Sequence, residues 1–232
     1  MIYSIYSSQK NIEHTEKNVC IATFCNEEFA KGAYALGYSI KEHHSPQLRM
    51  ICLVPMNMNV SYVNMLSTFW EIRYINVFKQ HSSSRVSWGK ISIWNLTEFS
   101  KVLYLDSDTI VMRPVDELFK FKELSCAPDP NIVQFCNTGV MIIEPNKQKL
   151  ADIMYFAKNT KELMNIGDQV YINKFFGQYN VIHPKYNTLV MGNEDPNSYI
   201  LHYVGKKPWE MEKRKSIWWQ KWEEACYVNL CI

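Results

Sequence analysis

The sequence predicts an α/β fold in which a mostly parallel central sheet carries helices on both faces. Short apolar runs alternate with segments of helical periodicity from Val19 to Val77. This alternation is typical of parallel sheets, because a crossover helix joins neighbouring strands. The chain has 232 residues, 47% of them hydrophobic, which suits one domain with a sizeable core. We therefore expect residues 1–232 to form a single domain, with a loose polar arm at 1–17 and a closing segment at 210–232.

The first half of the chain gives the clearest pattern. Val19 to Phe24 is rich in strand-forming residues, and Glu27 and Glu28 then open a helix with their charges near its positive end. A second apolar run stops at Pro55. The strands expected in this half are 19–24, 50–54 and 71–77, and the expected helices are 27–44, 60–70 and 88–99.

After Pro114 the alternation weakens, although separate elements remain recognisable. Asn146 is a good N-cap for a helix that runs to about Asn159, and the aromatic segment 217–231 has the composition of a closing helix. The other elements expected in this half are a short helix at 115–119, a turn at 127–130, a strand at 140–143 and a helix at 167–176.

Charge and hydropathy argue against two classes of partner. A net charge of +2, without a long run of Lys or Arg, gives no support for nucleic-acid binding. Charged residues or Pro interrupt every apolar run well before the roughly 18 residues that a membrane span needs, and the N-terminus does not resemble a signal peptide. The seven cysteines form no C-x-x-C pair. We therefore expect reduced, mostly buried thiols in a cytoplasmic protein without a membrane partner.

Residues 101–113 contain the strongest chemical signal. An apolar run at 102–105 is typical of a buried strand, and Asp106 and Asp108 follow it directly. Two carboxylates at such a place are costly unless a positive group meets them. A Mg²⁺ or Mn²⁺ ion that holds a phosphate is the natural partner, and a pair of solvated aspartates in a turn is the alternative. Asn26 also follows a strand, and ligands of open α/β sheets gather at the carboxyl ends of strands, which favours a nucleotide site.

Several separated motifs together resemble one known family. In chain order they are Asn26-Glu-Glu-Phe-Ala-Lys-Gly-Ala, Tyr104-Leu-Asp-Ser-Asp-Thr, Ala127-Pro-Asp-Pro, Asn137-Thr-Gly-Val, Gly167-Asp-Gln, His202-Tyr-Val-Gly and Lys207-Pro-Trp. In this order and spacing they resemble a glycogenin-like member of glycosyltransferase family 8, over about residues 19–209. The resemblance implies a GT-A-type fold and a UDP-sugar donor held through Mn²⁺, with Mg²⁺ as the other possibility.

The resemblance also implies a role for each matching residue. The metal ligands would be Asp106, Asp108 and His202, and the groups facing the diphosphate would be Lys90, Gly205 and Lys207. Around the uridine and its ribose would lie Thr23, Cys25, Asn26, Phe29 and the Ser107 backbone. The donor sugar would meet Asn137, Asp168 and Gln169, the last two as catalytic residues. A structural histidine and a simple helix N-cap are the alternatives for His202 and Asp168.

The implied reaction is retaining transfer of a hexose from UDP-glucose to a hydroxyl, in which the metal and the lysines stabilise the leaving diphosphate. A covalent intermediate and front-face return both stay open. The acceptor would be a glucan, an oligosaccharide or a protein tyrosine. A homodimer that glucosylates itself, with Tyr199 as the first candidate, and then builds a short glucan would be glycogenin-like.

Departures from the family pattern keep the donor and the acceptor open. Asn165 stands where the family often has an aspartate, Arg85 is not at the expected spacing, and the acceptor segment at 186–201 is short. The alternative is another UDP-sugar, UDP-galactose or UDP-glucuronate, and a separate carbohydrate acceptor.

Two other classes of protein share parts of this pattern. A haloacid-dehalogenase-like phosphatase also places D-x-D after a buried strand, but its nucleophilic strand comes early, whereas about a hundred residues precede Asp106 here. A non-catalytic nucleotide-sugar binder on the same fold is the second class, and a turnover assay separates it from an enzyme.

Overall fold

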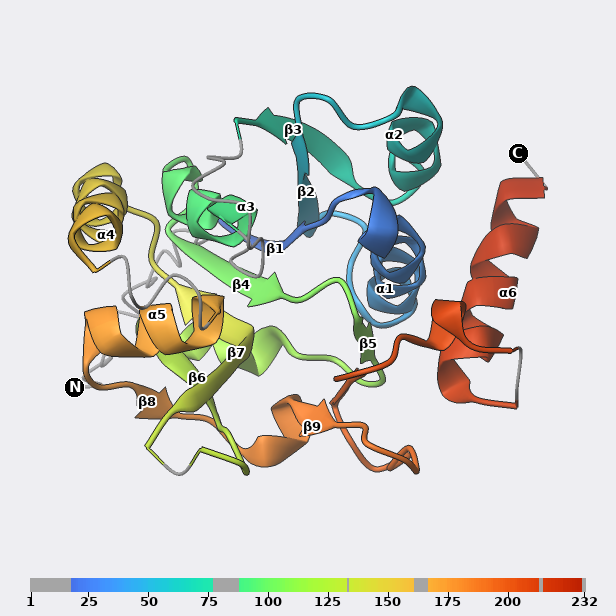
Figure 1. Ribbon diagram of the computed structural model, residues 1–232. Helices are drawn as coiled ribbons and strands as arrows, with labels where there is room; N and C mark the ends of the chain where they lie inside the picture. The colour runs from blue at the N-terminus through green and yellow to red at the C-terminus, as the bar shows by residue number, and fades with distance from the viewer. Residues whose placement is uncertain (1–17, 77–87, 133, 161–166, 213–214, 231–232) are drawn as a thin grey trace, which may run out of the picture.

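The computed structural model describes residues 18–76, 88–132, 134–160, 167–212 and 215–230 (Figure 1). The expected arm at 1–17, Arg85 and Asn165 lie outside these residues. A seven-stranded sheet forms the centre, in the order β3-β2-β1-β4-β7-β6-β8. Its strands are β1 (Val19–Phe24), β2 (Arg49–Pro55), β3 (Glu71–Ile75), β4 (Lys101–Leu105), β6 (Ser125–Pro128), β7 (Cys136–Ile143) and β8 (Asn180–Val181).

The first four strands of this sheet are parallel, as the alternation predicts. β1 pairs with β2 on one side and with β4 on the other, where Ala22 lies opposite Tyr104. Asn26 and Asp106 therefore leave the sheet at the same edge. Beyond β4, β7 is antiparallel to both β4 and β6, and β8 is parallel to β6. The prediction of an α/β fold with a mostly parallel sheet is confirmed.

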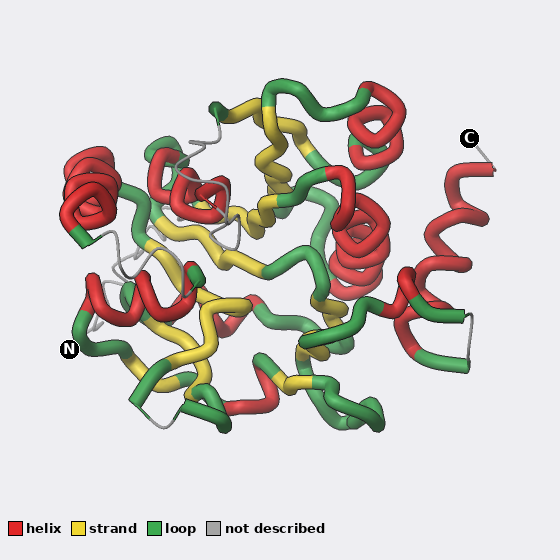
Figure 2. The backbone as a smooth tube through the Cα atoms, in the orientation of Figure 1, coloured by secondary structure: helices red, strands yellow, loops and turns green. Residues whose placement is uncertain are grey.

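Helices cover both faces of the sheet (Figures 1 and 2). Ile21 and Leu103 pack with α1 and α2 on one face, whereas Ala22 and Tyr104 pack with α3, α4 and α5 on the other. Successive strand residues point to opposite faces, so β1 and β4 contribute to both cores. The helices are α1 (Ala30–His43), α2 (Val60–Leu66), α3 (Trp88–Ile91), α4 (Lys147–Asn159), α5 (Asp168–Phe176) and α6 (Ile217–Leu230), with 3₁₀ turns η1 (Glu27–Phe29), η2 (Ser92–Asn95), η3 (Asp116–Lys120), η5 (Pro184–Tyr186) and η6 (Pro208–Glu210).

A second, three-stranded sheet brings a late part of the chain to the D-x-D turn. It consists of β5 (Thr109–Val111), β10 (Ile200–His202) and β9 (Thr188–Leu189), in the order β5-β10-β9. β10 is antiparallel to β5, and His202 lies opposite Thr109. Since Thr109 follows Asp108 directly, this register places His202 beside the two aspartates.

Three local predictions are wrong in detail. Residues 127–128 belong to β6 and not to a turn, because Ala127 and Pro128 pair with Asn137 and Cys136 of β7. Pro128 fits there because β8 pairs only with Ser125 and Cys126, which leaves one side of β6 as an edge at Pro128. The helix expected at 88–99 is α3 followed by a 3₁₀ turn that ends at Asn95, where the Leu96 backbone leaves the helical region. The helix expected at 60–70 ends at Leu66.

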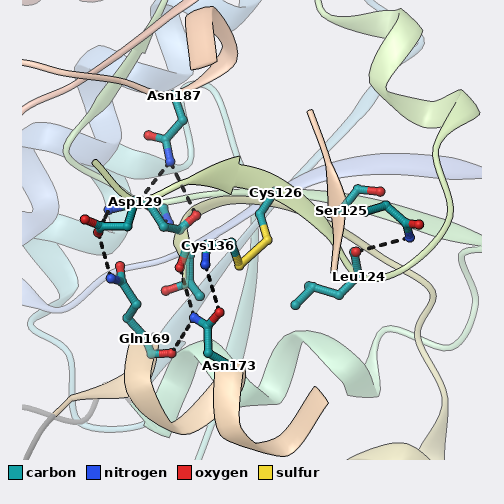
Figure 3. Close-up of a disulfide and its surroundings, with 12 residues drawn as sticks. Leu124, Ser125, Cys126, Asp129, Cys136, Gln169, Asn173 and Asn187 are labelled. Atoms are coloured by element: carbon teal, nitrogen blue, oxygen red, sulfur yellow. Dashed lines mark hydrogen bonds between the residues drawn. A yellow bond between two sulfur atoms is a disulfide. The ribbon is translucent and has the colours of Figure 1, made fainter. Parts of the chain in front are cut away.

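The prediction that all cysteines are reduced is also wrong, because a disulfide joins Cys126 to Cys136 (Figure 3). The two residues lie on the neighbouring strands β6 and β7, and only this pairing brings them together. Cys20, Cys25 and Cys52 are free and buried, as expected. Among the helices of the described residues, none is long and apolar enough to cross a membrane.

Candidate metal and nucleotide-sugar site

A tight turn after β4 sets the positions of the two aspartates. The N–H of Asp106 donates to the Gly139 carbonyl of β7 at 2.7 Å, and the backbone N–H and hydroxyl of Thr109 both donate to the Asp106 carbonyl, at 3.1 and 2.7 Å. The Asp108 carbonyl accepts from the Tyr203 N–H at 2.9 Å, which ties the turn to the end of β10. Backbone contacts from two other strands therefore hold the D-x-D turn.

Asp106, Asp108 and His202 converge on one point. Each offers one ligand atom, and these atoms all lie within 4.8 Å of one another. His202 Nε2 is 3.3 Å from Asp108 Oδ1 and 3.9 Å from Asp106 Oδ2. Two atoms that both bind a Mg²⁺-sized ion at about 2.0–2.1 Å lie no more than about 4.2 Å apart, so the separations of 3.3 and 3.9 Å are compatible with one ion. The residues therefore fit a divalent ion, and the imidazole is a softer ligand than the two carboxylates.

Two lysines flank the candidate metal ligands. The Lys90 ammonium is buried, and it lies 3.0 Å from Asp106 Oδ1 and 2.7 Å from Asp168 Oδ2. The Lys207 ammonium lies 2.5 Å from Asp108 Oδ2, the oxygen that does not face His202. Gly205, two residues before Lys207, has φ +78°, a conformation that glycine adopts without strain.

These contacts shift the pKa values of the charged groups. Burial acts to raise the pKa of Asp108, but the neighbouring His202 and Lys207 outweigh it and hold that pKa well below its ordinary value. Burial raises the pKa of Asp106, which the charge of Lys90 opposes only in part. Burial acts to lower the pKa of Lys90, but the charges of Asp106 and Asp168 outweigh it and raise that pKa. At neutral pH Lys90 is therefore a cation and Asp108 an anion.

Asp168 and Gln169 start α5 and face the same region. The N-cap of α5 is Gly167, so the interpretation of Asp168 as an N-cap is wrong; its carboxylate binds the Lys90 ammonium and lies 3.5 Å from the Thr138 hydroxyl. The Gln169 amide donates to Asp129 Oδ2 at 2.8 Å (Figure 3). Lys90 thus connects the candidate metal ligands to the first of the two candidate catalytic residues.

The residues expected around the nucleoside lie at the carboxyl end of β1 and in the turn after it. Thr23 is fully buried, and its hydroxyl has no hydrogen-bond partner among the described residues. Asn26 accepts from the Phe29 N–H at 3.2 Å, and the Phe29 ring centroid lies 5.6 Å from Lys207 Nζ. The Ser107 carbonyl faces Gly32 of α1 so closely that a Cβ there would come within 2.4 Å of it. Thr23 and Asn26 thus lie at the carboxyl end of β1 and just after it, Phe29 lies beside Lys207, and Ser107 is part of the D-x-D turn.

Cys25 lies differently from the other expected nucleoside residues. Its thiol is buried in the core, 3.8 Å from the Cys52 sulfur, so a nucleotide could reach only its backbone. An open hollow of about 330 Å³ lies beside it at the ends of β1 and β2, and its lining residues are Asn26, Glu27, Glu28, Pro55, Asn57 and Met58.

The structure adds residues for which the sequence predicted no role. Tyr104 donates to Asp106 Oδ1 at 2.6 Å from within β4. Asp129 lies in the Ala127-Pro-Asp-Pro motif and accepts from Gln169 and, at 3.3 Å, from the Asn137 amide. Asn187 joins Asn137 to His202, with contacts of 2.9 Å to each. The Ala127-Pro-Asp-Pro motif could have indicated Asp129 as a site residue, but no sequence signal connects Asn187 to the site.

Comparisons with known proteins find relatives among the glycosyltransferases. Residues 125–213 match the family described as Glycosyl transferase family 8. The chain is similar to glycogenin-1 of Homo sapiens, with 31% identity over 165 residues, which are 66% of this chain and 47% of glycogenin-1. It is also similar to the putative UDP-glucuronate:xylan alpha-glucuronosyltransferase 4 of Arabidopsis thaliana, with 27% identity over 79% of this chain and 35% of that protein. The chain spans half or less of the length of these two relatives.

Solved structures show the same fold at lower sequence identity. The glycosyltransferase GlyE of Streptococcus pneumoniae TIGR4 matches 90% of this chain and 63% of its own, with a TM-score of 0.70 and 19% identity. The galactosyltransferase LgtC, solved with donor and acceptor sugar analogs, matches 89% of this chain and 95% of its own, with a TM-score of 0.68 and 16% identity. Both are glycosyltransferases, and the predicted GT-A-type fold is confirmed.

Proposed function

Because this chain belongs to glycosyltransferase family 8 and is glycogenin-like, we propose that it is a metal-dependent retaining hexosyltransferase that uses UDP-glucose as its donor. The observation that carries the proposal is the convergence of Asp106, Asp108 and His202 within 4.8 Å, with one lysine on each side. A phosphatase of the haloacid-dehalogenase type is not supported, because the fold is that of the GT-A glycosyltransferases.

The positions of the residues suggest a separate role for each group of them. Asp106, Asp108 and His202 would hold Mn²⁺, and the ion would supply positive charge to the diphosphate of the donor. Lys207, released from Asp108 when the ion binds there, would turn its ammonium to the same diphosphate and stabilise it as it leaves. Asp108 stays ionised because its pKa is held low, so the metal site keeps its charge at neutral pH.

On the sugar face, Asp168 and Gln169 would stabilise the positive charge that develops at the anomeric carbon. Lys90 holds the Asp168 carboxylate at 2.7 Å, and Asp129 holds the Gln169 amide at 2.8 Å. Both side chains are thus preorganised before the donor binds, and preorganised charge is most effective in a site that excludes water. Thr23, Asn26, Phe29 and the backbones of Cys25 and Ser107 would bind the nucleoside.

A second donor has specific support. The similarity to the plant glucuronosyltransferase covers 79% of this chain, against 66% for glycogenin-1. UDP-glucuronate with a separate carbohydrate acceptor is therefore the second candidate. The two candidate donors differ in charge, because the glucuronate carboxylate needs a cation near the sugar. The Lys90 ammonium is already bound by two carboxylates, which favours the uncharged glucose.

Self-glucosylation between two copies of the chain remains part of the proposal, but the packing weighs against Tyr199 as the acceptor. Its ring is half-buried against Tyr186, with the centroids 4.6 Å apart. Tyr155 and Tyr227 are 72% and 71% exposed and are better placed for another subunit to reach. An acceptor hydroxyl must come within about 3–3.5 Å of the anomeric carbon, so exposure matters.

A donor screen tests the proposal. The purified protein is incubated with UDP-glucose, UDP-galactose or UDP-glucuronate and Mn²⁺, Mg²⁺ or EDTA, and UDP release and the intact mass of the protein are followed together. We expect the fastest UDP release with UDP-glucose and Mn²⁺, none with EDTA, and mass gains in steps of one hexose. Full activity after exhaustive EDTA treatment would contradict the metal role, and tight UDP binding without UDP release from any donor would indicate a non-catalytic binder.

A further inference from the structure

We propose that Asn187 is a positioning residue that fixes the tautomer of His202, so that the Nε2 lone pair faces the two D-x-D carboxylates. The inference rests on the proposed function, in which His202 is a metal ligand. Asn187 is 5% exposed, and its amide contacts Nδ1 of His202, whereas Nε2 is the ring nitrogen that faces Asp108. It acts through the hydrogen bonds that its amide makes.

The argument starts from Asn137, whose amide has only one possible orientation. Its Oδ1 accepts the backbone N–H of Gly139 at 3.0 Å, and a backbone N–H can only donate. Its Nδ2 faces Asp129 Oδ2 at 3.3 Å. Burial acts to raise the pKa of Asp129, but hydrogen bonds from Gln169, the Asn131 N–H and Asn137 outweigh it and lower that pKa, so the carboxylate is a pure acceptor.

The orientation of Asn137 then determines that of Asn187. The Asn187 amide contacts Asn137 Oδ1 at 2.9 Å, and because that oxygen is an acceptor, the Asn187 atom beside it must be the NH₂ group. The other end of the same amide, Oδ1, therefore lies 2.9 Å from His202 Nδ1. An amide oxygen has no hydrogen, so Nδ1 must carry the proton.

With the proton on Nδ1, a neutral His202 has its lone pair on Nε2. That atom is 3.3 Å from Asp108 Oδ1, where a metal ion between them would be bound. Metal-binding histidines usually donate their other ring N–H to a fixed acceptor, which sets the tautomer and the ring orientation. The chain of contacts from Gly139 through Asn137 and Asn187 provides this acceptor.

Packing fixes the rotation of the ring separately. A Cβ on Gly139 would lie 2.2 Å from His202 Cε1 and 2.5 Å from Nδ1, so the ring rests directly on the Gly139 backbone. β10 pairs with β5 at His202, which holds the backbone of the histidine. The hydrogen bond to Asn187 therefore controls which nitrogen is protonated, while the strands control where the ring lies.

The first test is a spectrum of the unchanged, metal-free protein. Long-range ¹H–¹⁵N correlations distinguish the two tautomers of a neutral imidazole, and a His202→Gln variant assigns the signal. The spectrum is recorded above the pH at which this ring titrates in the same experiment. We expect the Nδ1–H tautomer. A His202 ring in the Nε2–H tautomer would overturn the inference without any Asn187 variant.

The second test is the affinity for Mn²⁺, measured during titration from the electron paramagnetic resonance signal of free Mn²⁺. Asn187→Leu removes the acceptor and should weaken binding by about 10- to 100-fold, the usual effect of losing such a partner. Asn187→Asp keeps an oxygen for the Nδ1 proton and should recover most of the affinity, although it cannot donate to Asn137. A merely structural role would not give this recovery, since Asn187→Asp also loses a hydrogen bond.

Asn173→Leu is the matched control. Asn173 is also buried, at 8% exposed, and also hydrogen-bonds β7, through the N–H and carbonyl of Cys136 at 2.8 and 2.9 Å. This variant should lower the melting temperature without changing Mn²⁺ affinity by more than about 3-fold. If Asn187→Leu binds Mn²⁺ as tightly as the unchanged protein, the inference is wrong. If the unchanged protein binds no Mn²⁺, the proposed function fails, and the tautomer spectrum still decides the role of Asn187.

Discussion

Replacing Lys90 by Met should destabilise the metal-free protein and at the same time strengthen its binding of Mn²⁺. The Lys90 ammonium is buried between Asp106 and Asp168, at 3.0 and 2.7 Å. Methionine fills a similar volume but has no charge, so the substitution leaves two carboxylates close together without a cation. A Mn²⁺ ion bound by Asp106 would supply part of the missing positive charge.

The size of the effect follows from the exposure of the carboxylates. Removing one partner of a buried ion pair costs about 3–5 kcal/mol. The side chains of Asp106 and Asp168 are 27% and 23% exposed, and Tyr104 still donates to Asp106, so we expect a lower figure of about 2–3 kcal/mol. In a domain of this size that corresponds to roughly 4–12 °C in melting temperature. If Mn²⁺ restores about 1.4 kcal/mol of this loss, linkage requires about 10-fold tighter Mn²⁺ binding.

The assay is a thermal melt with and without Mn²⁺, together with a direct Mn²⁺ titration. Lys101→Met is the control, because Lys101 is also a buried lysine but donates to the carbonyls of Phe119 and Phe121, away from the site. It should lose stability equally in both conditions and keep its Mn²⁺ affinity. A Lys90→Met protein whose loss of stability is the same with and without Mn²⁺, or which binds Mn²⁺ more weakly, would refute the reasoning.

Three further predictions concern the aspartates of the site. Mn²⁺ at 100 times its Kd should stabilise the unchanged protein by about 2.7 kcal/mol, which raises the melting temperature by roughly 5–11 °C. A similar rise in the melting temperature of Asp108→Ala would contradict the assignment of Asp108 as a metal ligand. Asp168→Ala should keep its affinity for UDP with Mn²⁺, measured by calorimetry, and lose mainly the transfer rate. Asp108→Ala should lose both the affinity and the rate. Equal losses of affinity in the two variants would show that the separate roles assigned to the two aspartates are wrong. The pKa of Asp129 is lowered in the folded state, so its contribution to stability is present above the unfolded carboxyl pKa of about 3.9 and is lost as the pH falls through the folded value. Urea unfolding at several pH values should therefore show a smaller loss of stability below about pH 4 in Asp129→Asn than in the unchanged protein, and parallel curves would exclude this role.

The sequence by itself determined the parts of this protein that depend on local pattern. The alternation of apolar runs with helical periodicity predicted β1, α1, β2 and β3 within a few residues, because burial of one face imposes a period on neighbouring positions. The sequence predicts Asn146 as an N-cap, and the structure shows its side chain accepting from the Lys149 N–H. The sequence also indicates Asp106 and Asp108 as candidate metal ligands, because both follow a buried strand directly.

Only the tertiary structure decided which distant residues meet. Asn137 and Asn187 are 50 residues apart in the chain, and their contact depends on the small sheet that places β9 beside β10. The pairing of β6 with β7 likewise makes residues 127–128 part of a strand where a turn was expected, and it brings Cys126 next to Cys136. No periodicity encodes such contacts, because strand register and the crossing of chain segments result from packing of the whole core. The tautomer that we infer for His202 follows from this long-range register, and the sequence around the histidine contains no sign of it.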